Sequence, residues 1–356
     1  MRVAIDARAA TEEPGGRGRY VRELLIALAT RDDRDLEYLL LARTRWEGLA
    51  ADDRFSWRLI ASPDPVWHLR AALAANRSAD VMLSTNSYLT AWFTRIPTAV
   101  VVYDLITFRP ELLPQRRASV IERATAPHGV RRAGALICIS EATELDLVQR
   151  FPAARGRTAV TPLAADQRFA TAVASDPAGT LLRLGIAQPY VLATGTLEPR
   201  KNLERLIAAC EGRDLVLVGA TGWDADGILA AADTHRDRVK RLGHVSDHDL
   251  VALYRGAEVF CYPSPYEGFG LPVLEAMACG TPVVTSNLSS LPEVTGDAAV
   301  LVDPLDVRAI RDGLARAVQD APRLRAEGPR RAALFSWERT ARETVATLRT
   351  LAPQSG

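Results

Sequence analysis

Val259–Ser286 reads VFCYPSPYEGFGLPVLEAMACGTPVVTS, and this stretch holds the clearest indication of the fold. Val259–Tyr262 and Thr281–Ser286 are short, apolar, β-rich runs, typical of strands that are covered on both faces. Between them, Pro272 suits the first turn of a helix, where its missing N–H costs nothing. A strand, a loop, a helix and a second strand form one unit of a parallel α/β sheet.

The same alternation of strands and amphipathic helices runs through the whole chain. In the first half we expect strands at Arg2–Asp6, Glu37–Ala42, Trp57–Ala61, Val81–Ser84, Thr98–Asp104, Ala135–Ser140 and Thr158–Pro162. In the second half we expect further strands at Tyr190–Gly195, Asp214–Gly219, Val239–Leu242 and Ala298–Val302. The pattern predicts an α/β protein with two Rossmann-like, doubly wound parallel sheets that face each other across a cleft.

The length of 356 residues also suggests two domains. The stretch Ala165–Gly179 is small, polar and irregular, which favours a linker. We expect an N-terminal domain over 1–168, a C-terminal domain over 169–335 and a final helix over 336–356.

Composition excludes several classes of protein. The chain has 44 Lys and Arg against 43 Asp and Glu, so it lacks the basic excess of a nucleic-acid binder. Its four cysteines are far apart, which fits small buried side chains in a reducing compartment. The N-terminal MRVAIDARAA has no apolar signal-peptide core, and no apolar run approaches the about 20 residues that span a bilayer. We expect a soluble, cytoplasmic protein.

The strongest candidate site includes Glu267 and Glu275, which are eight positions apart. Gly268 and Gly270 let a ligand approach the backbone, and the N-terminus of the following helix can bind a phosphate. The two carboxylates can accept hydrogen bonds from sugar hydroxyls. In the alternative interpretation, Ser264 and Glu267 form a capping box and Glu275 only complements the helix dipole.

A second candidate is Gly195–Asn202, GTLEPRKN, which follows an apolar strand. Open α/β sheets bind ligands at the carboxyl ends of their strands. Arg200 and Lys201 could neutralise a diphosphate there, and Asn202 could cap the next helix. The alternative is a solvated basic turn.

Two weaker candidates lie in the first half. The run Gly15–Tyr20, GGRGRY, opens a helix, and Gly15 and Gly16 could pass close to a phosphate or a sugar. Tyr103 and Asp104 follow an apolar strand and would point into the cleft. A plain glycine-rich turn and a plain turn aspartate are the alternatives.

Two other features favour structural interpretations. The arginine-rich segment Pro114–Gly134 could contact an anionic lipid, but Pro127 interrupts it and a solvated face is favoured. His244 and His248 have a spacing that could hold a metal on one helix. Ser246 instead predicts a helix start between them, so we expect no metal site.

Seven motifs together resemble a known family. In chain order they are GGRGRYVRELL, VYDLITFRPE, ICISEATELDL, VTPLAAD, GTLEPRKNLERLI, GHVSDHDLVALYRGAEVFCYPSPYEGFGLPVLEAMACGTPVV and LPEVTGDAAVLVDP. The chain resembles the retaining glycosyltransferases of family 4 in the GT-B superfamily. The resemblance covers about residues 3–305. It also implies that the final helix, with Trp337, crosses back to the first domain.

The resemblance implies transfer of a sugar from a nucleotide-sugar donor with retention at the anomeric carbon, and no metal or other cofactor. The implied catalytic residues are Arg200 and Lys201 at the diphosphate, Glu267 at the donor sugar, and Asp104. The implied donor-binding residues are Gly15, Gly16, Tyr103, Gly195, Thr196, Phe269, Gly270, Leu271 and Glu275, the last at the ribose. The donor phosphate itself would take the acceptor proton.

The sequence departs from the family pattern at three positions. Tyr103 replaces the usual His, Ala164 replaces a Gly before the linker, and Thr196 replaces a common Arg. Diphosphate binding then depends more on Arg200 and Lys201.

The leading hypothesis is a cytoplasmic hexosyltransferase, with the inner face of the membrane as a second location. The variant EPRKN at Glu198–Asn202 resembles members that use GDP-mannose or similar donors. The acceptor would be a glycan, a lipid-linked glycan or a small molecule, and nucleic acid is not expected as a partner. The alternatives are a GT-B epimerase or phosphorylase and a non-catalytic nucleotide-sugar-binding protein. The sequence indicates neither the acceptor nor the oligomeric state.

Overall fold

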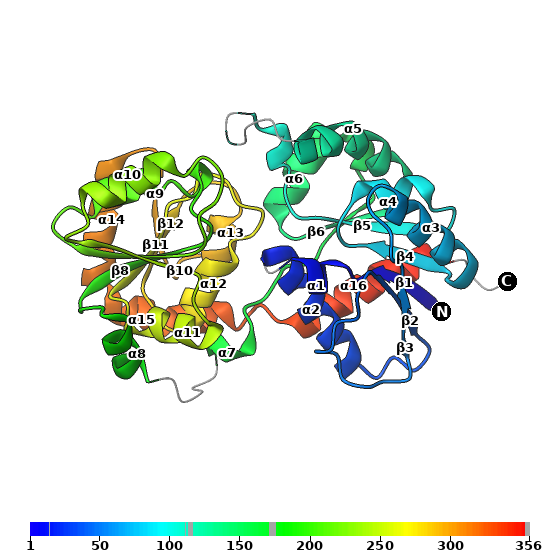
Figure 1. The fold of residues 1–356 in the computed structure, drawn as a ribbon, viewed down its shortest axis with the longest axis horizontal. Helices are drawn as coiled ribbons and strands as arrows, with labels where there is room; N and C mark the ends of the chain where they lie inside the picture. The colour runs from blue at the N-terminus through cyan, green and yellow to red at the C-terminus, as the bar shows by residue number, and fades with distance from the viewer. Residues whose placement is uncertain (14, 111, 113–116, 171–175, 353–356) are drawn as a thin grey trace. The chain divides into compact units, whose positions relative to one another are not determined.

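The computed structural model describes residues 1–13, 15–110, 112, 117–170 and 176–352. The chain divides into two compact units (Figure 1). The first unit comprises Met1–Leu163 together with Ser336–Gly356, and the second comprises Ala164–Phe335.

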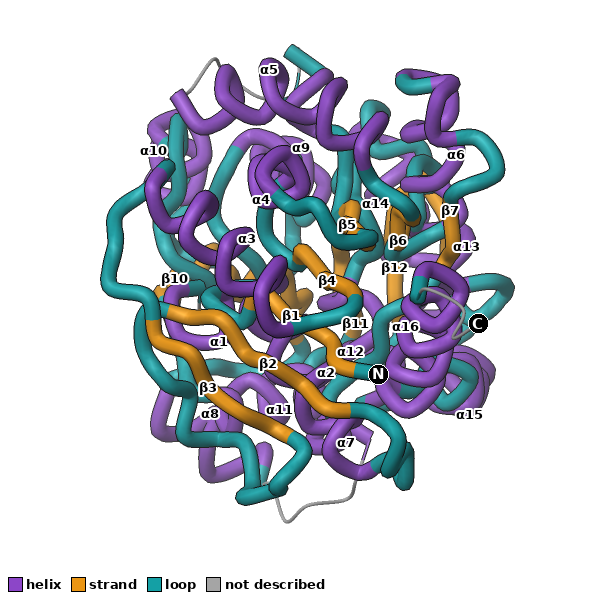
Figure 2. The backbone as a smooth tube through the Cα atoms, turned by 90° about the vertical axis from the view of Figure 1, so that its right-hand side faces the viewer, coloured by secondary structure: helices purple, strands orange, loops and turns teal. Residues whose placement is uncertain are grey.

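The first unit is built on a seven-stranded parallel sheet with the order β3-β2-β1-β4-β5-β6-β7. The strands are β1 (Arg2–Asp6), β2 (Glu37–Ala42), β3 (Phe55–Leu59), β4 (Val81–Ser84), β5 (Thr98–Val102), β6 (Ala135–Cys138) and β7 (Thr158–Val160). Figure 2 shows β3, β2, β1 and β4 side by side in this order. Four of them, β1, β4, β5 and β6, are buried almost throughout, because helices cover both faces of the sheet.

The helices of the first unit include two from distant parts of the chain that pack together, α2 and α16. The helices are α1 (Ala9–Glu12), α2 (Gly16–Thr30), α3 (Val66–Ser78), α4 (Tyr88–Phe93), α5 (Arg117–Arg132), α6 (Glu141–Arg150) and α16 (Trp337–Leu351). Trp337 of α16 lies against Tyr20 of α2, with ring centroids 6.1 Å apart. The last helix therefore belongs to the first unit.

The second unit is built on a six-stranded parallel sheet with the order β10-β9-β8-β11-β12-β13. The strands are β8 (Tyr190–Thr194), β9 (Asp214–Val218), β10 (Val239–Gly243), β11 (Val259–Tyr262), β12 (Val283–Ser286) and β13 (Val300–Val302). The helices are α7 (Gln167–Ala170), α8 (Pro177–Leu184), α9 (Leu203–Ala209), α10 (Asp226–Thr234), α11 (Asp247–Gly256), α12 (Leu271–Ala278), α13 (Leu291–Thr295), α14 (Val307–Gln319) and α15 (Ala321–Ala332). One hydrophobic core of this unit lies between the sheet and α9, α10 and α14.

In both sheets the first strand lies in the interior and the strand order reverses beside it. The reversal falls between β1 and β4 in the first unit and between β8 and β11 in the second. The loops that leave the two strands at such a point diverge, and this opens a crevice at their carboxyl ends. The expected class of two doubly wound parallel sheets is confirmed.

Several predicted boundaries were wrong. The chain changes units after Leu163 and not after residue 168, because α7 packs within the second unit through Phe169, whose ring lies 5.8 Å from that of Tyr254. The stretch Ala165–Gly179 is not wholly irregular, since it contains α7 and the start of α8. Strand β3 begins two residues earlier than expected, at Phe55.

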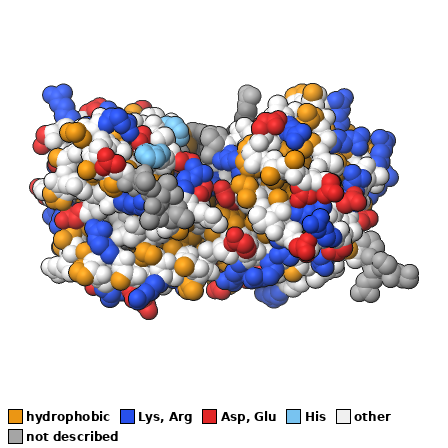
Figure 3. Space-filling model, turned by 90° about the horizontal axis from the view of Figure 1, so that it is seen from below, with side chains coloured by type: hydrophobic (Ala, Val, Ile, Leu, Met, Phe, Trp, Pro, Cys, Tyr) orange, Lys and Arg blue, Asp and Glu red, His pale blue; other side chains and the backbone are white. Residues whose placement is uncertain are grey.

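Two surface observations complete the description. Within the described part of the chain, no helix is long and apolar enough to cross a membrane. On the face drawn in Figure 3, acidic and basic side chains are interspersed over each unit without a large patch of one sign.

Candidate active site

Two neighbouring strands of the second unit deliver the predicted cations and the predicted carboxylate to one place. Strands β8 and β11 pair in parallel, so the loops at their carboxyl ends start side by side. The loop after β8 contains the 3₁₀ helix η3 (Pro199–Lys201), and the loop after β11 contains Glu267. Gly195 leaves β8 with a φ of +121°, a conformation that favours glycine.

The side chains from these loops form a compact ion cluster around Glu267. Its Oε1 lies 2.7 Å from Lys201 Nζ and 2.9 Å from Arg200 Nη1. The Tyr262 hydroxyl donates to the same oxygen over 2.9 Å and accepts a hydrogen bond from Lys201. Arg200 also pairs with Glu198 at 2.6 Å. Two cations and two carboxylates are therefore held together at the strand reversal.

Burial makes this cluster electrostatically strong. Lys201 is 8% exposed and Glu267 is 9% exposed. Burial would raise the pKa of Glu267, but Arg200 and Lys201 together lower it to about 2. Burial, and then Arg200, lower the pKa of Lys201, while Glu267 opposes that shift. Glu267 is therefore ionised at neutral pH and stabilises both cations.

The loop that carries Glu267 is fixed by two serines from the segment after β12. The Ser289 hydroxyl donates to the Glu267 carbonyl over 2.6 Å, and the Glu267 amide donates back to that hydroxyl over 3.2 Å. The Ser290 hydroxyl donates to the carbonyls of Glu267 and Phe269. These hydrogen bonds fix the backbone of Glu267 and so limit where its carboxylate can lie.

Helix α12 starts directly after this loop, at Leu271. Gly270 at its N-cap has a φ of +102°, a conformation that favours glycine, and a Cβ there would lie 2.6 Å from Leu291 Cδ2. Gly270 has no side chain that could cap this end, and Pro272 lies in the first turn as predicted. Such an N-terminus favours anions.

Glu275 lies on α12 and is 3% exposed. The Tyr254 hydroxyl, from α11, donates to its Oε2 over 3.2 Å. Thr194, the last residue of β8, lies within 3.0 Å of the same hydroxyl. Glu275 is thus tied to the end of β8, one residue before Gly195.

Two local interpretations of the sequence are wrong. Ser264 and Glu267 do not form a capping box, because the helix begins only at Leu271 and the Ser264 hydroxyl donates to the Arg200 and Tyr266 carbonyls. Asn202 precedes α9, but its side chain does not cap that helix. Its amide nitrogen donates to the carbonyls of Pro263 and Pro304 and joins three loops.

The remaining predicted residues lie in the first unit. Gly15 is the N-cap of α2 and Gly16 its first residue, and a Cβ at either position would meet no atom within 4 Å. Packing therefore does not require these glycines, which fits a backbone approached by a ligand. Tyr103 and Asp104 follow β5 and line a cavity of about 220 Å³. Asp104 also accepts a hydrogen bond from the Ile106 amide at 3.0 Å, as a turn residue does.

The arginine-rich segment behaves differently from the prediction. Helix α5 continues through Pro127, and two of its arginines bind backbone carbonyls of the first unit: Arg123 that of Thr107 and Arg132 that of Thr94. It is therefore not simply a solvated face. Residues 114–116 of the predicted segment lie outside the described residues.

The histidine pair is separated as expected. Ser246 is the N-cap of α11 and accepts a hydrogen bond from the Asp249 amide at 3.1 Å, so only His248 lies on the helix. No group of three or more His, Cys, Asp and Glu that could hold a metal occurs among the residues described.

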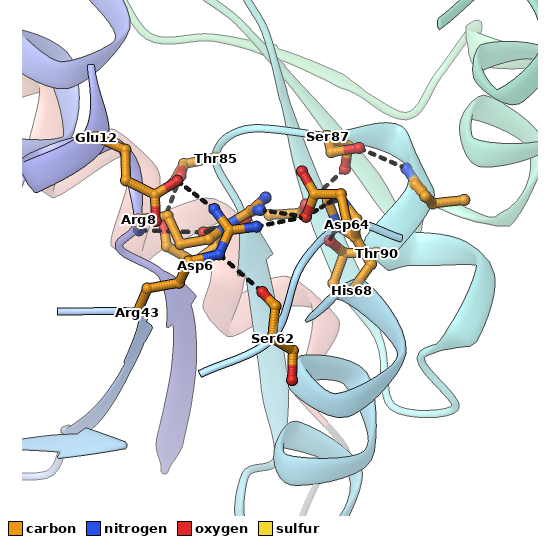
Figure 4. Close-up of polar contacts among 12 residues, drawn as sticks. Asp6, Arg8, Glu12, Arg43, Ser62, Asp64, His68, Thr85, Ser87 and Thr90 are labelled. Carbon is orange, nitrogen blue, oxygen red and sulfur yellow. Dashed lines mark hydrogen bonds and ion pairs between the residues drawn. The ribbon is translucent and has the colours of Figure 1, made fainter. Parts of the chain in front are cut away.

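Figure 4 shows a network of polar contacts in the first unit that the sequence did not reveal. Arg8 Nη2 lies 3.2 Å from Asp6 Oδ2, and both side chains are buried. Arg8 also pairs with Asp64 at 3.0 Å and stacks 3.7 Å from the Trp67 ring centroid. Arg43 pairs with the same Asp64 at 2.8 Å and joins the network there. The network ties the loop after β1 to the segment before α3.

Two site residues were missed for a physical reason. Tyr262 was counted only as a strand residue, although as the last residue of β11 it lies at the carboxyl edge of the sheet. Glu122, which lines the 220 Å³ cavity, lies on α5 within the arginine-rich segment but in none of the seven family motifs. An acidic residue within an otherwise basic helix was the available signal.

The chain was compared with known proteins. Residues 184–332 match the family model "Glycosyl transferases group 1". O-antigen chain mannosyltransferase B of Escherichia coli is 36% identical over 267 residues, 70% of this chain and 70% of that protein.

Solved structures share the fold of the whole chain. Sucrose-phosphate synthase of Thermosynechococcus elongatus has a TM-score of 0.78 at 22% identity, over 99% of both chains. HepE of Anabaena, solved with UDP and glucose, has a TM-score of 0.76 at 18% identity, over 98% of this chain and 100% of that chain. The chain therefore has the GT-B fold and belongs to the group 1 glycosyltransferases.

Proposed function

We propose that this glycosyltransferase is a retaining mannosyltransferase that uses a nucleotide diphosphate sugar, with GDP-mannose as the first candidate donor. The observation that carries the proposal is the ion cluster of Arg200, Lys201 and Glu267 at the strand reversal of the second unit. The mannosyl assignment is supported by the O-antigen chain mannosyltransferase. The guanine assignment is supported only by the EPRKN motif at Glu198–Asn202.

The proposed reaction forms a bond from an acceptor hydroxyl oxygen to the anomeric carbon and breaks the bond from that carbon to the diphosphate. The acceptor proton passes to a phosphate oxygen of the leaving nucleotide, so no protein nucleophile is needed. Arg200 and Lys201 would stabilise the charge that develops on the diphosphate, the kind of electrostatic stabilisation that supplies several kcal/mol in a dry site. The N-terminus of α12 would add to it.

The two carboxylates would act on hydroxyl groups of the donor. Glu267 would accept a hydrogen bond from the donor sugar, and its own pairing with Lys201 fixes where the sugar lies relative to the cations. Glu275, which accepts a hydrogen bond from Tyr254, would accept further hydrogen bonds from the ribose.

In this proposal the side chains of Arg200 and Lys201 bind the diphosphate. Turnover should therefore change less than twofold in excess EDTA.

The test is turnover of a panel of GDP-, UDP-, ADP- and dTDP-sugars with mannosyl acceptors, and the anomeric configuration of the product by NMR. The proposal expects transfer from GDP-mannose with an α-linkage retained. Turnover of UDP-sugars alone would contradict GDP-mannose as the donor. Inversion at the anomeric carbon would contradict the retaining mechanism. An altered donor sugar without acceptor would favour an epimerase, and nucleotide binding without turnover would favour a non-catalytic protein.

A further inference from the structure

The hydroxyl of Tyr262 lies between the ammonium of Lys201 and the carboxylate of Glu267. Lys201 Nζ donates one hydrogen bond to the Tyr262 hydroxyl and a second, over 2.7 Å, to Glu267 Oε1. The Tyr262 hydroxyl donates to the same carboxylate oxygen over 2.9 Å. Three hydrogen bonds therefore close a ring of three side chains, in which the tyrosine is both acceptor and donor. The proposed reaction assigns roles to the lysine and the glutamate but none to this hydroxyl.

The ring of hydrogen bonds accounts for two of the three N–H groups of Lys201. An ammonium has three donors and no acceptor. In the part of the chain that the structure describes, Nζ donates only to Tyr262 and to Glu267. Two fixed acceptors determine where the nitrogen lies and in which direction its third N–H points. With Glu267 as the only acceptor, the ammonium could rotate about that hydrogen bond, because the lysine stem is flexible.

The backbones that carry Lys201 and Tyr262 are joined to each other. The side-chain amide of Asn202 donates to the carbonyl of Pro263 over 3.0 Å. These two residues directly follow the lysine and the tyrosine in the chain. The Tyr262 carbonyl also accepts a hydrogen bond from the Thr285 hydroxyl over 2.8 Å. Both backbones are therefore held, and the long lysine side chain is the part that the tyrosine hydroxyl can orient.

The aromatic ring of Tyr262 is held independently of its hydroxyl. The residue is 3% exposed, and its ring stacks on that of Phe260, with centroids 5.9 Å apart and an interplanar angle of 19°. Lys201 Nζ lies 4.9 Å from the centroid of the Tyr262 ring, within the range of a cation–π contact. A phenylalanine at this position would keep the ring contacts and lose only the hydroxyl.

The Tyr262 hydroxyl stays protonated and contributes no charge of its own. Burial and the neighbouring Glu267 raise the pKa of Tyr262 well above its ordinary value, while Arg200 opposes that shift. At neutral pH the hydroxyl can therefore accept from Lys201 and donate to Glu267 at the same time. The charge at this place comes from the lysine, and the tyrosine affects only its direction.

We propose that Tyr262 is a positioning residue for sugar transfer, whose hydroxyl orients the Lys201 ammonium so that its third N–H faces the leaving diphosphate. The proposal rests on the proposed function, because it assigns a further role in the same reaction. Tyr262 acts through Lys201 and not on the bonds that form and break. Its loss would misdirect a charge that matters most in the transition state, where negative charge builds on the diphosphate. We therefore expect an effect on kcat more than on KM.

The test compares steady-state kcat and KM of wild type and Tyr262→Phe, with the nucleotide sugar that the donor panel shows to be turned over. In Tyr262→Phe, kcat should fall about tenfold or more, as expected when a hydrogen bond to a charged group is lost. KM for the donor should change less than about threefold. The matched control is Tyr38→Phe, which should keep wild-type kcat. Tyr38 is also buried in a strand, and its hydroxyl has no hydrogen-bond partner among the described residues.

A double-mutant cycle shows whether the hydroxyl acts through the ammonium. In a Lys201→Ala background, Tyr262→Phe should change kcat less than about twofold, because the group that the hydroxyl orients is absent. Measurements of Tm check that each variant is folded. Wild-type kcat in Tyr262→Phe, equal proportional losses of kcat in both backgrounds, or a loss confined to KM would each overturn the proposal.

The role of Tyr262 and the proposed function fail in different ways. Turnover by wild type together with an unchanged kcat in Tyr262→Phe refutes the role of Tyr262 alone. Absence of turnover of every nucleotide sugar by wild type refutes the proposed function, and this role with it. The cycle can be measured with any donor that is turned over, so an error in the donor assignment alone does not affect it.

Discussion

The strand reversals of the two units carry different charge arrangements on the same kind of sheet. At β8 and β11, Arg200 and Lys201 are each paired with a carboxylate beside an uncapped helix N-terminus. In the first unit, the described lining of a small cavity holds Arg17 together with two carboxylates, Asp104 and Glu122. The same kind of sheet thus holds different side-chain clusters at its carboxyl edge, and under the proposed function the cluster of the second unit would hold the donor diphosphate.

The largest expected effect is on the stability of the first unit and concerns the buried pair of Arg8 and Asp6. Arg8→Ala leaves Asp6 buried without its guanidinium partner, and loss of one member of a buried pair costs about 3–5 kcal/mol. We expect the free energy of unfolding of the first unit to fall by that amount in urea denaturation. Glu211→Ala, which breaks an exposed pair with Arg311, should change stability little. Equal effects of the two variants would show that the network of Figure 4 does not stabilise the first unit.

The next effect concerns Arg200 and Lys201 at the strand reversal of the second unit. Lys201→Ala removes a buried ammonium that pairs with Glu267, and turnover should fall about 100-fold or more if that charge stabilises the leaving diphosphate. The matched control is Lys240→Ala, because Lys240 is the other lysine of the chain, lies in the same unit and donates to the Gly185 carbonyl at the surface. A folded Lys201→Ala protein with near wild-type kcat would remove this role.

A smaller effect is expected from the buried carboxylate of α12. Glu275→Ala should weaken donor binding about tenfold with a smaller change in kcat, because hydrogen bonds to a charged group contribute about 1.5–3 kcal/mol. Calorimetric titration with the donor nucleotide measures this. If the affinity is unchanged while kcat falls, Glu275 does not bind the ribose.

The smallest effect is a difference in pH dependence. The folded pKa of Glu267 is about 2, below its ordinary value of about 4.3, so ionised Glu267 stabilises the fold above about pH 4.3. That contribution is lost as the pH falls towards 2. Wild type should therefore lose Tm more steeply than Glu267→Gln between about pH 4.5 and 2. Parallel Tm curves would mean that the carboxylate is not held ionised by Arg200 and Lys201.

Sequence reasoning worked best where signals are local. The sheet strands were predicted because runs such as YVLAT at Tyr190–Thr194 are apolar up to their last residue and buried at every position. The grouping of Arg200, Lys201 and Glu267 followed from motifs after two strands that later proved to be neighbours. Spacing along the chain could not show that β8 lies beside β11.

The failures arise where the partner is distant or the backbone is unusual. Arg8 meets Asp64 only because the chain folds back over more than fifty residues. Asn202 has a left-handed conformation, so its side chain turns away from the cap position expected of an asparagine before a helix. Glu122 carries no motif, and only the packing of α4 on α5 brings it beside Asp104.

The most direct test of the charge comparison is calorimetric titration of GDP and of guanosine, with UDP and uridine in parallel, into wild type and into the Arg200→Ala, Lys201→Ala double variant. If Arg200 and Lys201 hold the diphosphate, wild type should bind one nucleotide far more tightly than its nucleoside. The double variant should lose this difference. A double variant that stays folded and keeps the full preference for the diphosphate would contradict the account.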